Sequence, residues 1–137
     1  MKIHKKPALF CLGGMAYVGL EYLWRGRSHI SMFLAGGTCF LLLGKLPRWN
    51  RLPRAVAGSA VITAVELLFG LVVNRHYTVW DYRGLPGNFL GQICPAYCLL
   101  WLPLSLAAMA LYPQVAGLLD RILGDGEDFV KTEQNPE

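Results

Sequence analysis

Charged side chains are scarce in this sequence. Only 16% of its 137 residues are Asp, Glu, Lys or Arg, and 54% are hydrophobic, whereas charged residues make up about a quarter of an ordinary soluble domain. The few charges crowd into short segments between long apolar runs, which is typical of a polytopic membrane protein. The net charge of +4 does not indicate a nucleic-acid surface, because the basic residues flank apolar runs, where they set membrane topology.

Several familiar chemical motifs are also missing. The sequence contains no phosphate-binding glycine loop, no nucleotide fingerprint, no zinc-protease motif and no Ser/His/Asp order. Among the four cysteines, Cys94 and Cys98 have the wrong spacing for a Cys-x-x-Cys redox pair, and free Cys is a common small residue of buried helices. We therefore expect no cofactor, no metal site and no nucleic-acid partner, while enzymatic activity stays an open question.

Four apolar runs predict an all-α fold of four transmembrane helices, arranged as two helical hairpins over residues 7–24, 28–44, 55–73 and 88–112. Each run approaches the ~20 residues that cross ~30 Å of hydrocarbon. The second run is the shortest. The fourth contains Pro95 and Pro103, which predict a kink where the backbone lines a cavity or packs on protein.

The last part of the chain has a different pattern. Apolar residues at helical spacing within residues 114–123 predict a short amphipathic helix along the cytoplasmic interface. From Gly124 the chain is acidic and polar, which predicts a disordered cytoplasmic tail. The expected organisation is a single four-helix transmembrane domain over residues 1–123, followed by the tail at 124–137.

The distribution of basic residues predicts the orientation. With four crossings, nine of the 13 Lys and Arg residues lie on the side of the two termini, and Arg25, Arg27, Arg75 and Arg83 lie on the other. The positive-inside rule then places both termini in the cytoplasm. No small-residue cleavage site follows the first apolar run, so we expect that run to be a retained helix. The predicted location is the plasma (inner) membrane, as a multi-pass protein.

In this orientation, the polar side chains of the helices gather in the outer half of the membrane. Glu66 lies about seven residues, or roughly 10 Å, from the outer end of its helix. Glu21 and Gln92 lie within four residues of the outer ends of theirs. The candidate residues for binding a ligand or ion are Glu21, Arg25, His29, Glu66, Asn74, Trp80, Asp81, Tyr82, Asn88 and Gln92.

Glu66 is the most informative single residue. A carboxylate at membrane depth costs several kcal/mol unless it is protonated, paired or facing water. One interpretation is a proton carrier, a cation ligand or a general acid/base. The other is a buried pair with Arg25 or His29 that fixes helix packing.

Two further residues near the first turn have alternative interpretations. Glu21 precedes Arg25 by four residues, the favourable order for a helical ion pair worth ~0.3–0.5 kcal/mol in water. Arg25 either belongs to this pair or presents its guanidinium group to an anionic ligand or lipid phosphate. His29 either titrates near neutral pH or is a hydrogen-bonded residue at a helix start.

The segment after the third run combines aromatic and polar residues. Trp80 and Tyr82 fit an aromatic belt at the membrane interface. Asp81 could cap the fourth helix, pair with Arg25 or Arg83, or bind a ligand. Asn88 is expected to be the N-cap of the fourth helix.

Two motifs resemble those of a known family. The first is Glu21 to Gly37, read as Glu-x-x-Trp-Arg-Gly-x-Ser-His-x-Ser-Met-Phe-x-x-Gly-Gly. The second comprises Glu66, Gly70, Asn74, Val79-Trp80-Asp81-Tyr82, Asn88-Phe89-Leu90-Gly91-Gln92-Ile93-Cys94 and Trp101. Over roughly residues 10–112 the chain resembles the putative ABC-transporter type IV (CmpB-like) family, and this resemblance implies a transporter permease. Arg83 departs from the small polar residue that the family tends to have there.

Together, these features predict a small integral membrane transporter or permease-like protein with an outer-leaflet polar pocket for an ion or small polar solute. Because four short helices enclose little volume, we expect a homo-oligomer or a partner membrane subunit within the lipid bilayer. One alternative is a membrane-embedded enzyme or lipid-binding protein, with Arg25, His29, Glu66 and Asp81 as phosphate clamp and acid/base. Another is a structural partner subunit in which Glu66 holds helices together.

Overall fold

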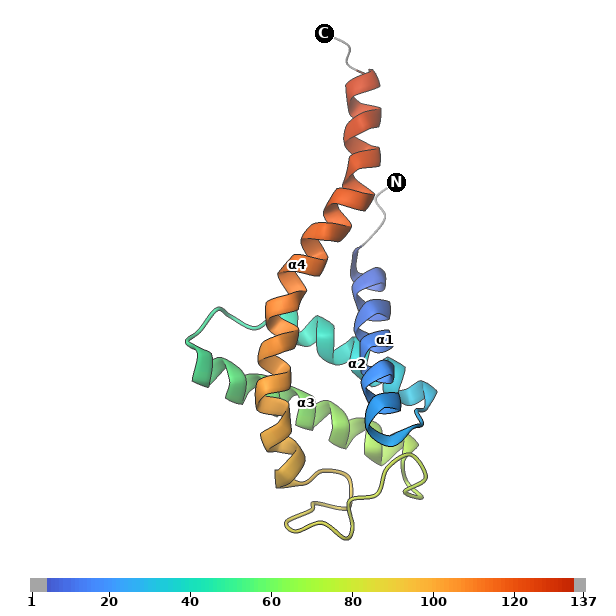
Figure 1. Ribbon diagram of the computed structural model, residues 1–137, viewed down its shortest axis with the longest axis vertical. Coiled ribbons are helices and arrows are strands. Elements are labelled where there is room, and N and C mark those ends of the chain that lie inside the picture. Colours follow the sequence, from blue (N-terminus) through green and yellow to red (C-terminus); the bar gives the residue numbers. More distant parts are fainter. Residues whose placement is uncertain (1–4, 135–137) are drawn as a thin grey trace.

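The computed structural model describes residues 5–134, with side chains described for residues 5–123, and its regular structure in this range is helical. The helices are α1 (Lys5–Arg25), α2 (Ile30–Gly44), α3 (Arg51–Val73) and α4 (Pro95–Gln134) (Figure 1). The predicted all-α class is confirmed for this part of the chain, and four of the predicted helices are present. The predicted disorder of residues 124–137 lies beyond the described side chains and stays a prediction.

Within residues 5–134, two helices are long and apolar enough to cross a membrane. These are α3, with a mean hydropathy of 2.2, and the part of α4 from Pro95 to Leu123, with a mean hydropathy of 1.5. α2 is apolar but has only 15 residues, or about 22 Å of helix, less than the ~30 Å of a bilayer core. Crossings by α1 and α2 therefore stay predictions.

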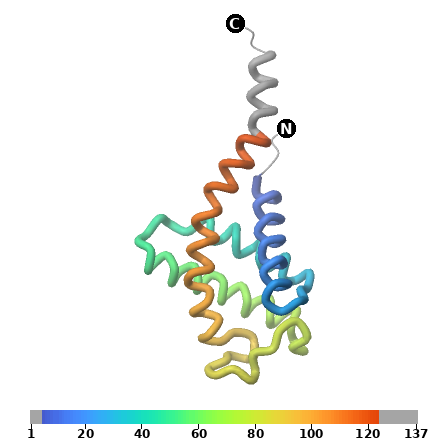
Figure 2. Tube along the Cα trace, in the orientation of Figure 1, coloured from blue at the N-terminus to red at the C-terminus, as the bar shows by residue number. Residues whose placement is uncertain are grey.

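The helices lie in two directions. α1 and α4 follow the long axis of the molecule, whereas α2 and α3 lie across them (Figures 1 and 2). α1 packs most extensively on α2, and α3 packs on α4. In the described range, no close backbone approach joins α1 to α3, and the cavity described below lies between these two helices.

Glycines set the crossing of α1 over α2. A Cβ at Gly14 would lie 2.5 Å from the carbonyl oxygen of Phe33, and a Cβ at Gly37 would lie 2.6 Å from that of Phe10. Because these neighbours are backbone atoms, no side-chain movement can make room for a larger residue. Small residues allow the same close approach wherever membrane helices pack through their backbones.

The structure corrects two predicted boundaries of the last helix. α4 begins at Pro95 rather than at Asn88, so the expected N-cap role of Asn88 is wrong and Gln92 lies in the preceding loop. Proline suits the first position of a helix, because the N–H that it lacks would have no helical partner there. α4 also continues through Pro113, so the separate amphipathic helix predicted at 114–123 is wrong. Internal prolines are tolerated in membrane helices, where neighbouring groups re-satisfy the freed carbonyls.

Two polar contacts fix the ends of α1. At its start, Lys5 Nζ lies 2.9 Å from Asp120 Oδ1 of α4. At its end, Arg25 Nη1 donates to the carbonyl oxygen of Val79 at 3.1 Å, in the loop between α3 and α4. α1 therefore extends alongside α4 from the Asp120 turn to the loop at the opposite end of the molecule.

Candidate functional site

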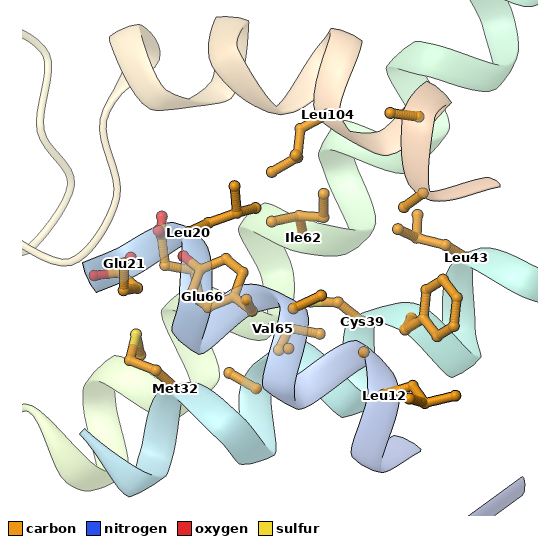
Figure 3. Close-up of a pocket in the computed structure, with 18 of the residues that line it drawn as sticks. Leu12, Leu20, Glu21, Met32, Cys39, Leu43, Ile62, Val65, Glu66 and Leu104 are labelled. Carbon is orange, nitrogen blue, oxygen red and sulfur yellow. The ribbon is translucent and has the colours of Figure 1, made fainter. Parts of the chain in front are cut away.

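A cavity of about 240 Å³ lies between the four helices and is lined on one side by the loop that follows α3. Most of its wall is apolar, as shown by Ile62, Leu104 and Leu43 (Figure 3). Glu21 and Glu66 lie together at one end of this space (Figure 3). The cavity is thus polar at one end only, and its predicted location in the outer half of the membrane stays a prediction.

Glu66 brings a carboxylate from α3 into this end of the cavity. Its Oε2 atom accepts a hydrogen bond from the hydroxyl of Tyr82 at 3.2 Å. Its Oε1 atom is buried and has no hydrogen-bond partner among the described residues. Burial and, next, the Glu66 carboxylate raise the pKa of Tyr82, so its hydroxyl keeps the proton that it donates.

Glu21 and Arg25 form an ion pair across one turn of α1. Arg25 Nε donates to Glu21 Oε2 at 2.6 Å, and its Nη2 contacts the same oxygen. Both side chains are largely buried, with 13% of Glu21 and 23% of Arg25 exposed. Because Arg25 also donates to Val79, its guanidinium is occupied by the protein itself. The predicted i,i+4 pair is confirmed, and the alternative pairing of Arg25 with Glu66 or Asp81 is not formed.

Asn74, at the end of α3, organises the loop from within. Its Oδ1 accepts from the backbone N–H groups of Val79 at 2.9 Å and Trp80 at 3.2 Å. Its Nδ2 donates to the Trp80 carbonyl at 2.7 Å and to Gln92 Oε1 at 2.9 Å. Gln92 donates back to the Asn74 carbonyl at 3.0 Å, and its own carbonyl accepts from the Trp80 indole at 3.0 Å. Asn74 and Gln92 therefore shape the loop, and neither lines the cavity.

A row of aromatic rings passes through the same region. Tyr82 stacks on Tyr97 with centroids 4.7 Å apart, and Trp80 lies 6.4 Å from Tyr82. Trp101 continues the row at 5.9 Å from Tyr97 and 6.3 Å from Tyr17. The Trp101 indole N–H is buried, has no hydrogen-bond partner among the side chains and backbone that the structure describes, and lies near the Glu66 carboxylate, outside hydrogen-bond geometry. Tyr82, in this row, is the ring that donates to the carboxylate.

Three predicted site residues lie away from the cavity. His29 is the N-cap of α2, where its Nδ1 accepts from the Ser31 N–H at 3.1 Å. Asp81 is exposed and pairs with Arg83 at 2.8 Å, and the hydrogen bonds from Arg83 lower the pKa of Asp81 to about 2. Asn88 bridges its own turn by accepting from the Gly91 N–H at 3.0 Å.

The cavity thus assembles half of the predicted set. Glu21, Arg25, Glu66, Trp80 and Tyr82 line it, whereas His29, Asn74, Asp81, Asn88 and Gln92 do not. Sequence reasoning did not select Tyr17, although its spacing of four residues from Glu21 places both on one face of α1. Within the described residues, no three His, Cys, Asp or Glu side chains gather closely enough to hold a metal ion.

Residues 9–129 match the model of a protein family described as Putative ABC-transporter type IV. The chain belongs to this family. The resemblance predicted from the motifs at Glu21–Gly37 and Glu66–Trp101 is confirmed by this match, which also extends along α4. Arg83 serves as the partner of Asp81. No curated protein and no solved structure matches the chain.

Proposed function

We propose that this member of the Putative ABC-transporter type IV family is a small integral membrane permease-like protein that binds an ion or small polar solute at Glu66. The observation that carries the proposal is the buried Oε1 atom of Glu66, which lies at a cavity without a hydrogen-bond partner among the described residues. Buried polar atoms in proteins are almost always hydrogen-bonded, and ionisable groups at membrane depth commonly mark solute pathways. The free oxygen therefore suits a group that is supplied by a ligand.

The contacts at both ends of α1 support a crossing by α1, one of the four crossings that we propose. The loop after α3 meets the end of α1 through Val79 and Arg25, and the opposite end of α1 meets α4 at Asp120. If α4 crosses the bilayer, α1 crosses beside it. With the excess of basic residues on the side of the termini, the proposed topology has both termini in the cytoplasm of a plasma-membrane protein.

The outer surface supports a lipid environment. Large apolar side chains point outward from three helices, including Leu23 of α1, Leu68 of α3 and Leu99 of α4, which are 87%, 64% and 66% exposed. Contiguous exposed apolar surface marks membrane or protein contacts. We propose the bilayer as the main partner, with further copies of the chain or another membrane subunit completing the assembly.

The lipid-headgroup alternative has less support. Its phosphate clamp requires Arg25, His29, Glu66 and Asp81 to act together, but His29 and Asp81 do not line the cavity. Arg25 is occupied by Glu21 and Val79. We therefore carry only the permease-like function forward.

The test is flux through purified protein in liposomes. Uptake of rubidium ion, methylammonium, alanine and glucose is compared for wild type, Glu66→Gln and Asp81→Asn. The proposal expects at least one solute to enter faster than into empty liposomes, and expects Glu66→Gln to abolish this uptake while Asp81→Asn keeps it. Uptake no faster than into empty liposomes, or equal uptake by wild type and Glu66→Gln, would remove the proposal.

The topology has a separate test. In a variant whose natural cysteines are replaced by alanine, Arg27→Cys and Asn50→Cys each place one thiol at an exposed position. With four crossings, a membrane-impermeant maleimide added to intact cells labels Arg27→Cys but not Asn50→Cys. Labelling of neither variant until the cells are opened would leave only α3 and α4 as crossings.

A further inference from the structure

We propose that the solute is a small organic cation, whose ammonium group binds Glu66 while a compact apolar body contacts the helix walls. This inference rests on the proposed function and names the class of solute. Three features of the cavity lead to it: its carboxyl group without a basic partner, its aromatic residues and its apolar wall.

Two carboxyl groups but one basic side chain line the cavity. Arg25 neutralises Glu21, and its remaining guanidinium contact is to Val79. Among the described residues that line the cavity, Glu66 is the carboxylate without a basic partner. An ammonium group beside Oε1 would donate to the free oxygen and supply the missing positive charge, which is how intramembrane carboxylates are stabilised.

Aromatic residues surround this position. Tyr17, Trp80 and Tyr82 all line the cavity, and Tyr82 is held beside the carboxylate by its hydrogen bond to Glu66. The faces of aromatic rings attract organic cations, most strongly where water is excluded, and cages of such rings recognise quaternary ammonium groups. A carboxylate among aromatic rings thus favours an ammonium group over an anion or a sugar.

The rest of the wall argues against a bare metal ion. Calcium and magnesium ions need about six or more oxygen ligands, whereas the described residues contain no cluster of three ligating side chains. Leu20, Ile62 and Leu104 offer only carbon contacts, which suit an apolar body. At about 240 Å³, the cavity is smaller than the ~300–1,000 Å³ of drug-sized ligand sites, so this body is compact.

The test measures binding, separately from transport. Protein in phosphatidylglycerol nanodiscs is titrated with choline, with benzyltrimethylammonium and with 3,3-dimethylbutan-1-ol, which has the shape of choline but no charge. We expect benzyltrimethylammonium to bind most tightly, because its ring adds apolar contact, and the neutral alcohol to bind at least about tenfold more weakly than choline, a difference of about 1.4 kcal/mol.

Matched variants locate the site. Glu66→Gln keeps the shape of the side chain and should weaken binding of both cations at least about tenfold. Asp81→Asn makes the same acid-to-amide change at an exposed residue outside the cavity and should change neither. Thermal unfolding of each variant checks the fold, and if Glu66→Gln does not fold, the comparison of choline with its neutral isostere in wild type decides alone. Equal affinity for these two molecules, or cation binding that Glu66→Gln leaves unchanged, would overturn the inference.

Lipid composition distinguishes two sources of the ammonium group. If phosphatidylcholine nanodiscs weaken binding of benzyltrimethylammonium, lipid headgroups compete for the site and are a source of the ligand. Equal binding in both lipids supports a free cation. Cation binding without any flux would remove only the proposed function, whereas flux of alanine or glucose without cation binding would remove only this inference.

Discussion

Glu66 lies in α3, and Asn74 caps the end of the same helix eight residues later. The two residues differ in how many of their side-chain polar atoms form hydrogen bonds. Asn74 is completely buried, and both atoms of its amide are hydrogen-bonded within the loop. Glu66 has one oxygen bonded to Tyr82 and the other buried without a partner. Full satisfaction is typical of a residue that holds the fold, and an unfilled acceptor at a cavity is typical of a residue that meets a ligand.

The largest loss of stability is expected from Asn74→Ala. This change removes four side-chain hydrogen bonds and leaves the backbone groups of Val79 and Trp80 unpaired inside the loop. Each buried unpaired group costs about 1–3 kcal/mol, so we expect a loss of about 3–5 kcal/mol in the free energy of unfolding. Chemical denaturation in detergent measures it, with Asn88→Ala as the less buried control. A loss below about 1 kcal/mol for Asn74→Ala would remove the contrast between the two residues.

A smaller loss is expected from Arg25→Gln. Without the guanidinium, Glu21 loses its cationic partner at the cavity and the loop loses its contact at Val79. A loss of about 1–3 kcal/mol follows from leaving a largely buried charge uncompensated. The double change Glu21→Gln with Arg25→Gln should recover part of it, because no lone charge remains. If the double variant is less stable than Arg25→Gln alone, the pair is not what stabilises this end of α1.

The exposed pair in the loop should matter least among the charged contacts. The pKa of Asp81 is lowered to about 2 by the hydrogen bonds from Arg83, below its ordinary value of about 3.9. The contribution of this pair is therefore fully present above about pH 4 and is lost as the pH falls through about 2. Titration of the Asp81 carboxyl by NMR measures the midpoint, which Arg83→Gln should raise toward the ordinary value. A midpoint near 4 in wild type would show that the pair does not form in solution.

The sequence predicts the helices better than it predicts the loop between the last two. Apolar run lengths locate α1 to α3 within a few residues, because hydrophobic periodicity is a strong signal. The segment 88–94 is as apolar as a helix, yet it is a loop, in which Leu90 and Gly91 have positive φ angles of 55° and 68°. Its shape depends on Asn74, which lies 14 residues earlier, and local sequence does not reveal such a contact.

For the candidate site, the sequence predicts how far along its helix a polar residue lies better than it predicts the direction of the side chain. Counting residues from the helix ends places Glu21 and Glu66 toward the same end of the bundle, because the rise per residue is fixed, and both line the cavity. It does not say toward which side each group points. Asp81 faces outward because Arg83, two residues away, binds it there, and His29 is used as a helix cap. Both were expected at the pocket, and contacts with residues only two positions away hold them elsewhere.

The most direct test of the difference between Glu66 and Asn74 measures stability and flux of Glu66→Gln in one preparation. The amide keeps an acceptor for Tyr82 and introduces no volume change, so we expect the unfolding free energy to stay within about 1 kcal/mol of wild type. Solute uptake should fall to the level of empty liposomes. The opposite result, a variant destabilised as strongly as Asn74→Ala whose folded fraction still transports at the wild-type rate, would show that Glu66 serves the fold and not a ligand.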